Sequence, residues 1–157
     1  MFSKTIWPAI GVWAVGVGWL ADAPVIRADE RKVRITVAAI LATDRNNTVD
    51  PKLARIAREI QKTDPQLTGF VLAQTTRKSL PVGGNFQFPL VDQEVVDIVV
   101  DKGVDQQNMV SLKLKPPQLG EIVYMTACDK FFPIVTRYQT KDKDRLIIAI
   151  MVRPSRH

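Results

Sequence analysis

The chain has 157 residues, 22 Lys and Arg against 16 Asp and Glu, and a formal net charge of +6. Its hydrophobic share of 46% and charged share of 24% are typical of one globular domain, and they exclude a disordered or collagen-like chain. One Cys excludes an intrachain disulfide, and one His, at the last position, excludes a catalytic triad built on an internal imidazole.

Residues 1–28 have the layout of a secretory signal peptide. Lys4 precedes 17 residues without a charge, and small residues follow at Ala23 and Ala28. A cut after Ala28 avoids the proline that would follow a cut after Ala23. The rest of the chain is then expected to work outside the cytoplasm, in the periplasm or envelope.

An uncleaved membrane anchor is the alternative interpretation of residues 5–21. These 17 residues would span about 25 Å as a helix, less than the roughly 30 Å hydrocarbon core of a bilayer. Trp7, Trp13 and Trp19 favour an anchor, because indole rings prefer the membrane interface. Residues 5–21 would then contact the membrane and leave the domain on its extracytoplasmic side.

Residues 29–157 are expected to form a single α+β domain. Within it, residues 33–41 alternate between apolar and polar side chains and then become continuously apolar. This pattern is typical of a strand that is buried first on one face and then on both. A polar loop separates this strand from the next predicted element.

Asp50 and Pro51 mark the start of the one predicted helix, as N-cap and first helical residue. Its apolar face is formed by side chains at helical spacing: Leu53, Ile56, Ala57 and Ile60. The helix is expected to end near Thr63, because Pro65 disfavours helical geometry in the residue before it.

The remaining chain is predicted to form strands and turns. The strands cover residues 69–80, 86–90, 95–100, 109–114, 122–127, 131–138 and 146–152. Gly83 and Gly84 indicate a tight turn, and Pro89 indicates an edge strand. Because the helix joins the first two strands, we expect a βαβ unit there. The predicted fold class is α+β: one helix packed on a mostly antiparallel sheet of seven or eight strands, preceded by a hydrophobic N-terminal segment.

No catalytic residue, metal ligand or cofactor site is predicted. The motifs of serine hydrolases, zinc proteases, P-loop proteins and dinucleotide-binding proteins are missing from the sequence. Acidic residues gather at Asp92, Glu94, Asp97, Asp101 and Asp105. We interpret them as a solvated strand edge and turn, with Asp97 on the face opposite the apolar side chains of its strand. A hydrolase that uses a carboxylate pair is the alternative.

Cys128 follows an apolar strand, and we interpret it as a small buried side chain. In an oxidising compartment, a single cysteine has an alternative role as a cross-link between two chains. A catalytic thiol is not expected, because no internal histidine is present to activate it.

Cations on the helix and near the C-terminus form a candidate surface for an anion or a partner. The residues are Lys52, Arg55, Arg58, Lys62 and Arg145. Acidic residues are interspersed among them, so ordinary solubilising charge is the alternative interpretation. Nucleic acid is not expected as a partner, because no aromatic side chain lies among the cations of the helix.

The order of the predicted elements follows three segments: VAAILATDRNNTVDPKLARIAREIQ, TGFVLAQTTRKSLPVGGNFQFPL and LIIAIMVRP. These segments resemble a group of small exported bacterial α+β domains of uncharacterised function. The resemblance implies an exported single domain and brings no active-site residue with it. The last hairpin turn, residues 141–144, lacks the glycine that the group would have there.

We therefore expect a non-enzymatic exported interaction domain that docks on another envelope protein. One alternative is a membrane-anchored accessory subunit of a larger membrane complex, held by residues 5–21. The other alternative is binding of an anionic polysaccharide or lipid surface through the cations named above.

Overall fold

The computed structural model describes residues 32–156, which form eight strands and one α-helix. The strands are β1 (Val33–Thr43), β2 (Gly69–Leu80), β3 (Asn85–Pro89), β4 (Val95–Lys102), β5 (Met109–Lys115), β6 (Ile122–Ala127), β7 (Phe132–Gln139) and β8 (Arg145–Pro154). The helix α1 (Ala54–Thr63) follows a short 3-10 turn, Pro51–Leu53. The expectations for residues 1–28, with Trp7, Trp13 and Trp19, lie outside the described residues. Within residues 32–156, no helix has the length and apolar character that crossing a membrane requires.

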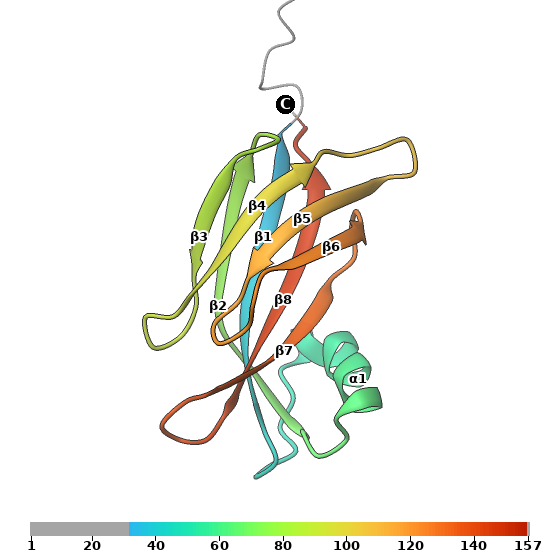
Figure 1. Ribbon diagram of the computed structural model, residues 1–157. Coiled ribbons are helices and arrows are strands. Elements are labelled where there is room, and N and C mark those ends of the chain that lie inside the picture. The colour runs from blue at the N-terminus through green and yellow to red at the C-terminus, as the bar shows by residue number, and fades with distance from the viewer. Residues whose placement is uncertain (1–31, 157) are drawn as a thin grey trace, which may run out of the picture.

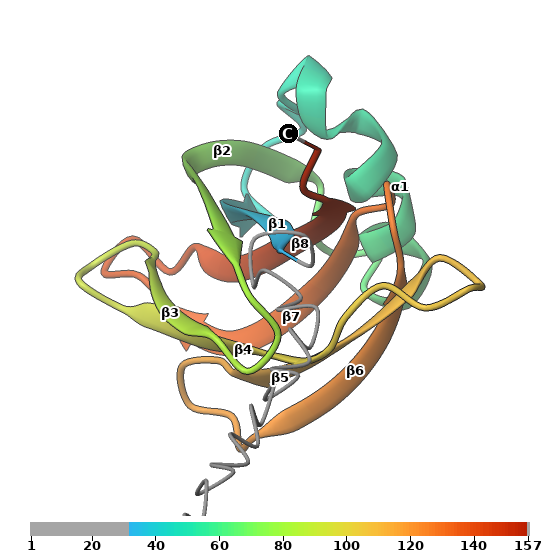
Figure 2. The same ribbon diagram turned by 90° about the horizontal axis from the view of Figure 1, so that it is seen from above.

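The strands form two antiparallel sheets of four that pack face to face (Figure 1). Sheet A has the order β2-β1-β8-β7, and sheet B has the order β3-β4-β5-β6. The main core lies between the two sheets, and a second core lies between sheet A and α1. Viewed from above, the helix covers the side of sheet A that faces away from sheet B (Figure 2). The molecule therefore has three layers.

The α+β class is confirmed, with one helix and eight strands, but the expectation of one sheet is wrong. Both sheets carry a complete apolar face, as the buried side chains of β4 and β8 show: Val96, Ile98, Val100, Leu146, Ile148, Ile150 and Val152. A helix of ten residues cannot cover the apolar face of eight strands. The strands therefore divide into two sheets that cover each other.

The expected βαβ unit is also wrong, because β1 and β2 pair antiparallel from Val33↔Leu80 to Thr43↔Gly69. After the helix, two backbone hydrogen bonds bring the chain back beside the end of β1. The amide of Thr68 donates to the carbonyl of Thr43 (2.9 Å), and the amide of Phe70 donates to the carbonyl of Thr48 (2.9 Å). These bonds place the start of β2 beside the end of β1, so β2 runs antiparallel to β1.

Strand β1 confirms the predicted change from one buried face to two. Val33, Ile35 and Val37 point into the main core, while Arg34 between them is exposed. From Ala38 onward the outward side chains are covered as well, because α1 packs against this half of the sheet. β8 lies beside β1 and is buried in the same way, with Ile147 and Ala149 in the second core.

The helix lies where the sequence places it and ends at Thr63 as expected. The carboxylate of Asp50 accepts a hydrogen bond from the amide of Lys52 (3.0 Å), and Pro51 follows at the first position. The first turn is a 3-10 turn, so the α-helix itself begins at Ala54. All four predicted apolar side chains are buried: Leu53, Ile56, Ala57 and Ile60. Each contributes to the free energy of folding by burial, up to about 1.5–3 kcal/mol for a full Leu or Ile side chain.

Two turn predictions have different outcomes. Pro89 does lie in an edge strand, β3, where its missing amide costs no ladder bond. Gly83 has φ +81, as a tight turn requires, but Gly84 has no positive φ. In the last hairpin, Lys143 adopts φ 65 and takes the left-handed position without a glycine.

Candidate functional site

A groove of about 430 Å³ lies between α1 and the turn that joins β6 to β7. Its floor is apolar and is formed by Ile56, Phe131, Pro133 and Met151. Ile56 is nearly covered, whereas the ring of Phe131 is 39% exposed and open to solvent. The rim is charged: Lys52, Arg55, Glu59, Asp129 and Lys130. We refer to this feature as the helix groove.

Local structure explains how the rim is assembled from two segments far apart in the chain. The hydrogen bond from the Lys52 amide to the Asp50 carboxylate caps the first turn before α1. Lys52 lies in this turn, and Arg55 follows just after it. On the other side, Asp129 adopts φ 66, and its amide donates to the carbonyl of Val152 (2.9 Å). This bond ties the turn to β8 and places Lys130 and Phe131 opposite the helix.

The charges on the rim are not balanced within the groove. Glu59 is paired with Lys62 at 2.8 Å, and Asp129 is paired with Arg153 at 2.8 Å, and neither cation lines the groove. By contrast, Lys52, Arg55 and Lys130 take part in no ion pair among residues 32–156. Three cations without an ion pair therefore line the groove, while each carboxylate has a cationic partner outside it.

The five predicted cations do not form one surface. Lys52 and Arg55 line the helix groove. Arg58 is exposed on the same helix but does not line it, and Lys62 is engaged with Glu59. Arg145 lies apart from them, beside a small cavity of about 110 Å³ near the end of the helix.

Arg145 has a structural role in this arrangement. Its Nη1 donates to the carboxylate of Asp64 at 3.0 Å and so connects β8 to the end of α1. Its Nε is buried and has no hydrogen-bond partner among the described residues. A buried donor without a partner is unfavourable, so the ion pair with Asp64 is what holds the side chain in place.

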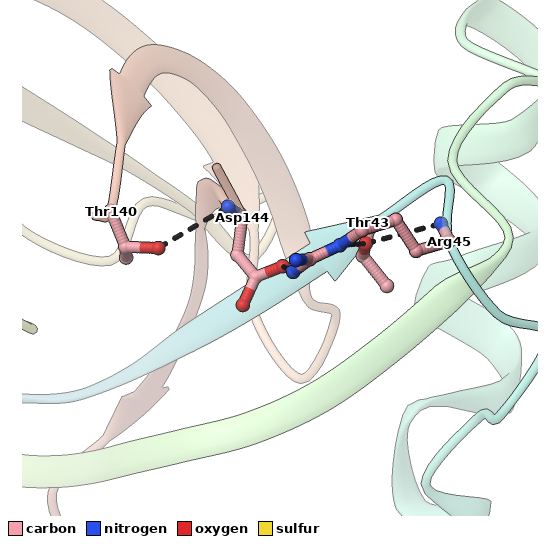
Figure 3. A network of polar contacts seen from close by, with 4 residues as sticks. All are labelled: Thr43, Arg45, Thr140 and Asp144. Carbon is pink, nitrogen blue, oxygen red and sulfur yellow. Dashed lines mark hydrogen bonds and ion pairs between the residues drawn. The ribbon is translucent and has the colours of Figure 1, made fainter. Parts of the chain in front are cut away.

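A second ion pair crosses the same end of the molecule. Arg45, in the loop after β1, forms an ion pair with Asp144, the residue before β8, and its Nε donates to the hydroxyl of Thr43 at 3.1 Å (Figure 3). The amide of Asp144 in turn donates to the hydroxyl of Thr140 at 3.2 Å (Figure 3). This network joins the last hairpin to the end of β1, and its groups are engaged with one another.

The acidic cluster does not converge on a shared site. Asp97 lies on the outer face of β4, opposite the buried Val96 and Ile98, as predicted. Asp101 accepts from the hydroxyl of Ser111 at 3.2 Å. Asp105 caps the β4–β5 turn by accepting from two backbone amides at 2.9 Å. Among the described residues, no group of three or more His, Cys, Asp or Glu is placed to hold a metal ion.

Cys128 is 4% exposed and belongs to the main core, which confirms its interpretation as a buried side chain. Burial raises the pKa of its thiol above the ordinary value, and the nearby carboxylates of Asp129 and Asp105 act in the same direction. The thiolate, which is the reactive form, is therefore disfavoured at neutral pH.

Strand β6 presents a second surface that the sequence did not reveal. It is the last strand of sheet B and pairs only with β5, so its other edge has no partner strand among residues 32–156. It contains no charge and no proline, and three consecutive side chains are exposed: Val123 (58%), Tyr124 (40%) and Met125 (58%). We refer to this surface as the β6 edge.

The other edge strands carry the features that protect an edge from pairing. β2 contains Arg77 and Lys78, β3 has five residues and ends in Pro89, and β7 contains Pro133. β6 has none of these features. Sequence reasoning predicted a strand here, but an apolar run of six residues is equally typical of a buried central strand.

Comparison of the chain with protein-family models, with curated proteins and with solved structures finds no match.

Proposed function

We propose that the protein is a non-enzymatic, extracytoplasmic interaction domain that docks on another envelope protein through the β6 edge. The observation that carries this proposal is the uncharged, proline-free edge strand with three exposed apolar side chains, Val123, Tyr124 and Met125. The signal-peptide pattern of residues 1–28 supports the extracytoplasmic location.

Strand addition is the binding mode that suits such an edge. Backbone amides and carbonyls along the free side of β6 can form a ladder with an extended segment of the partner, which supplies affinity. Val123 and Met125 point to the same face of the sheet, because strand side chains alternate, and they offer two neighbouring apolar contacts to that segment. Exposed apolar surface of this kind often marks an interaction site.

The occupant that we propose is an extended segment of a different, acidic protein. Without residues 1–28, which contain Lys4, Arg27 and Asp22, the net charge of +6 becomes +5, so two copies repel each other, whereas an acidic partner is attracted. Lys113 lies directly beside Val123 across the β5–β6 pair. Its Nζ is 3.7 Å from the carboxylate of Asp101, so the preference for an acidic partner rests on the net charge of the chain.

Site-specific photo-cross-linking in the native cell tests the proposal. A photoreactive phenylalanine analogue in place of Val123 is expected to yield one discrete adduct with an envelope protein. The adduct should be lost in the Met125→Lys background, because a charge on the edge disfavours strand pairing. Val71→Lys is the matched control: Val71 is 53% exposed on an edge strand of the other sheet, and the adduct should remain.

Three results would contradict the proposal. An adduct with twice the mass of the chain would identify a second copy as the occupant. Equal adduct yield in the Met125→Lys and Val71→Lys backgrounds would show that the β6 edge is not the contact surface. The lack of any adduct at Val123 in cells that express the folded protein would show that the edge is free.

A further inference from the structure

We propose that the helix groove binds a single-chain anionic amphiphile, a fatty-acid carboxylate, with its head among Lys52, Arg55 and Lys130. The alkyl chain lies along the floor formed by Ile56, Phe131 and Met151. This site is separate from the β6 edge, and it makes the alternative of anionic-ligand binding specific to one place and one class of ligand.

The ion pairs of the rim residues favour binding of an anion in the groove. Both carboxylates on the rim have cationic partners that lie outside the groove, at 2.8 Å in each case. Lys52, Arg55 and Lys130 have no such partner among the described residues. Cations that line one groove and form no ion pair attract an anion, and hydrogen bonds between charged groups are about twice as strong as neutral ones.

The apolar floor favours an anion that carries an alkyl chain. A free inorganic anion gains nothing from Phe131 and Met151, whereas an alkyl chain is stabilised by about 0.8 kcal/mol for each buried CH₂ group. The volume of about 430 Å³ lies within the range of small-molecule sites, about 300–1,000 Å³. An apolar floor beneath a cationic rim fits a ligand with both parts.

A single chain and a membrane surface differ in how much of the helix groove they contact. Ile56 is 8% exposed because it packs in the second core, so the apolar surface that the groove offers is mainly that of Phe131 and Met151. A layer of lipid headgroups would contact the charged rim alone, whereas an alkyl chain also gains contacts with Phe131 and Met151. One extended chain can enter from the side of the exposed Phe131 ring and contact both.

Titration calorimetry with the full chain and sodium decanoate, below its micelle concentration, tests the proposal. Decanoate is expected to bind one site per chain, decanol to bind at least about tenfold more weakly, and inorganic phosphate to give no heat. Lys52→Gln/Arg55→Gln should weaken decanoate binding at least about tenfold, since hydrogen bonds to two charged groups are lost. Met151→Trp, which fills the groove and keeps its charges, should weaken it as well.

The matched control is Arg58→Gln/Lys141→Gln, which removes the same charge from two exposed residues outside the groove. Its affinity should stay within about twofold of the unaltered protein. Because residues 1–31 are the same in all variants, uptake of decanoate by that segment would be equal in every variant and cancels in the comparison.

Four outcomes would overturn the proposal. Equal weakening in the control and the Lys52/Arg55 variant would leave only net charge as the cause. Decanol binding as tightly as decanoate would show that the cations do not take part. Binding of inorganic phosphate alone would indicate a plain anion site. Retention on phosphatidylglycerol vesicles without binding of monomeric decanoate would assign the cations to a lipid surface.

Discussion

The ring of Tyr124 stacks on the ring of Phe132, with centroids 4.3 Å apart and planes inclined by 23°. Tyr124 belongs to β6 at the edge of sheet B, and Phe132 belongs to β7 at the edge of sheet A. The stacked pair therefore connects the two sheets on the side where the sandwich is open.

This pair is expected to contribute to stability through its rings and not through the hydroxyl. Tyr124→Ala should lower the free energy of unfolding by about 1–2 kcal/mol, because both the stacking and the cover over Phe132 are lost. Tyr124→Phe keeps the ring and should change it by less than about 0.5 kcal/mol. Urea unfolding followed by circular dichroism measures both. A larger loss in Tyr124→Phe than in Tyr124→Ala would contradict the stacking argument.

The ion pair of Arg145 and Asp64 gives a second prediction. Asp64→Ala should destabilise the protein by about 1–2 kcal/mol, since it leaves a partly buried guanidinium whose Nε already has no partner. The double variant Asp64→Ala/Arg145→Met should recover part of this loss, because the unsatisfied donor is removed too. Arg45→Ala breaks a more exposed pair together with the Nε hydrogen bond to Thr43, and it should cost less than about 1 kcal/mol. If the effects of Asp64→Ala and Arg145→Met on thermal unfolding simply add in the double variant, Asp64 and Arg145 are not coupled.

Lys143 offers a stabilising substitution. It adopts φ 65 in the last hairpin, a conformation that is unfavourable for any residue with a Cβ and free of strain for glycine. Lys143→Gly should therefore stabilise the protein by about 0.5–1 kcal/mol, after the greater freedom of glycine in the unfolded chain is subtracted. Lys141→Gly, in the same turn but without a positive φ, should be neutral or destabilising in the same thermal unfolding assay.

Cys128 predicts a pH dependence of stability. Burial raises the pKa of its thiol, so the folded state keeps the proton to a higher pH than the unfolded state, whose thiol has a pKa of about 8.5. The contribution of the buried thiol to the free energy of unfolding is fully present below the pKa of the unfolded state. It is lost as the pH rises through the pKa of the folded state. The difference in unfolding free energy between the unaltered protein and Cys128→Ala should therefore shrink between about pH 8 and pH 10.

This difference is the quantity to measure, because Tyr138 titrates in the alkaline range as well. Burial, followed by the hydrogen bond that its hydroxyl donates to Asp92 (3.0 Å), raises the pKa of Tyr138. Its contribution is the same in both proteins and cancels. A difference that stays constant up to pH 10 would show that the thiol keeps its ordinary pKa.

The N-terminus of the protein isolated from its native cell separates the exported domain from the anchored subunit. We expect a mature chain that begins at Asp29, because the cut after Ala28 fits the signal-peptide pattern. Such a chain has lost Trp7, Trp13 and Trp19 and absorbs at 280 nm almost only through its two tyrosines. Intact-mass spectrometry checks the prediction. A mass that includes Met1 would contradict this prediction and would favour the membrane-anchored accessory subunit.

Most secondary-structure elements could be predicted because the signals are local. The helix follows from Asp50, Pro51 and four apolar residues at helical spacing, and β1 follows from alternation that turns into a continuous apolar run. Local signals of this kind depend on neighbours within a few residues. The same signals placed Lys52 and Arg55 on the exposed side of the helix, and these two residues line the helix groove.

The partner of each strand could not be predicted, and both candidate surfaces depend on it. Residues 122–127 and 146–152 are similar apolar runs, yet β6 is an edge with Val123 and Met125 58% exposed, and β8 is a central strand. Lys130 and Phe131 meet the helix only because β7 and β8 place the turn there. The sequence by itself determined the class of the fold, the one helix and the eight strands. Only the tertiary structure decided the two sheets, the helix groove and the β6 edge, because pairing between distant segments decides which apolar faces are covered and which stay open.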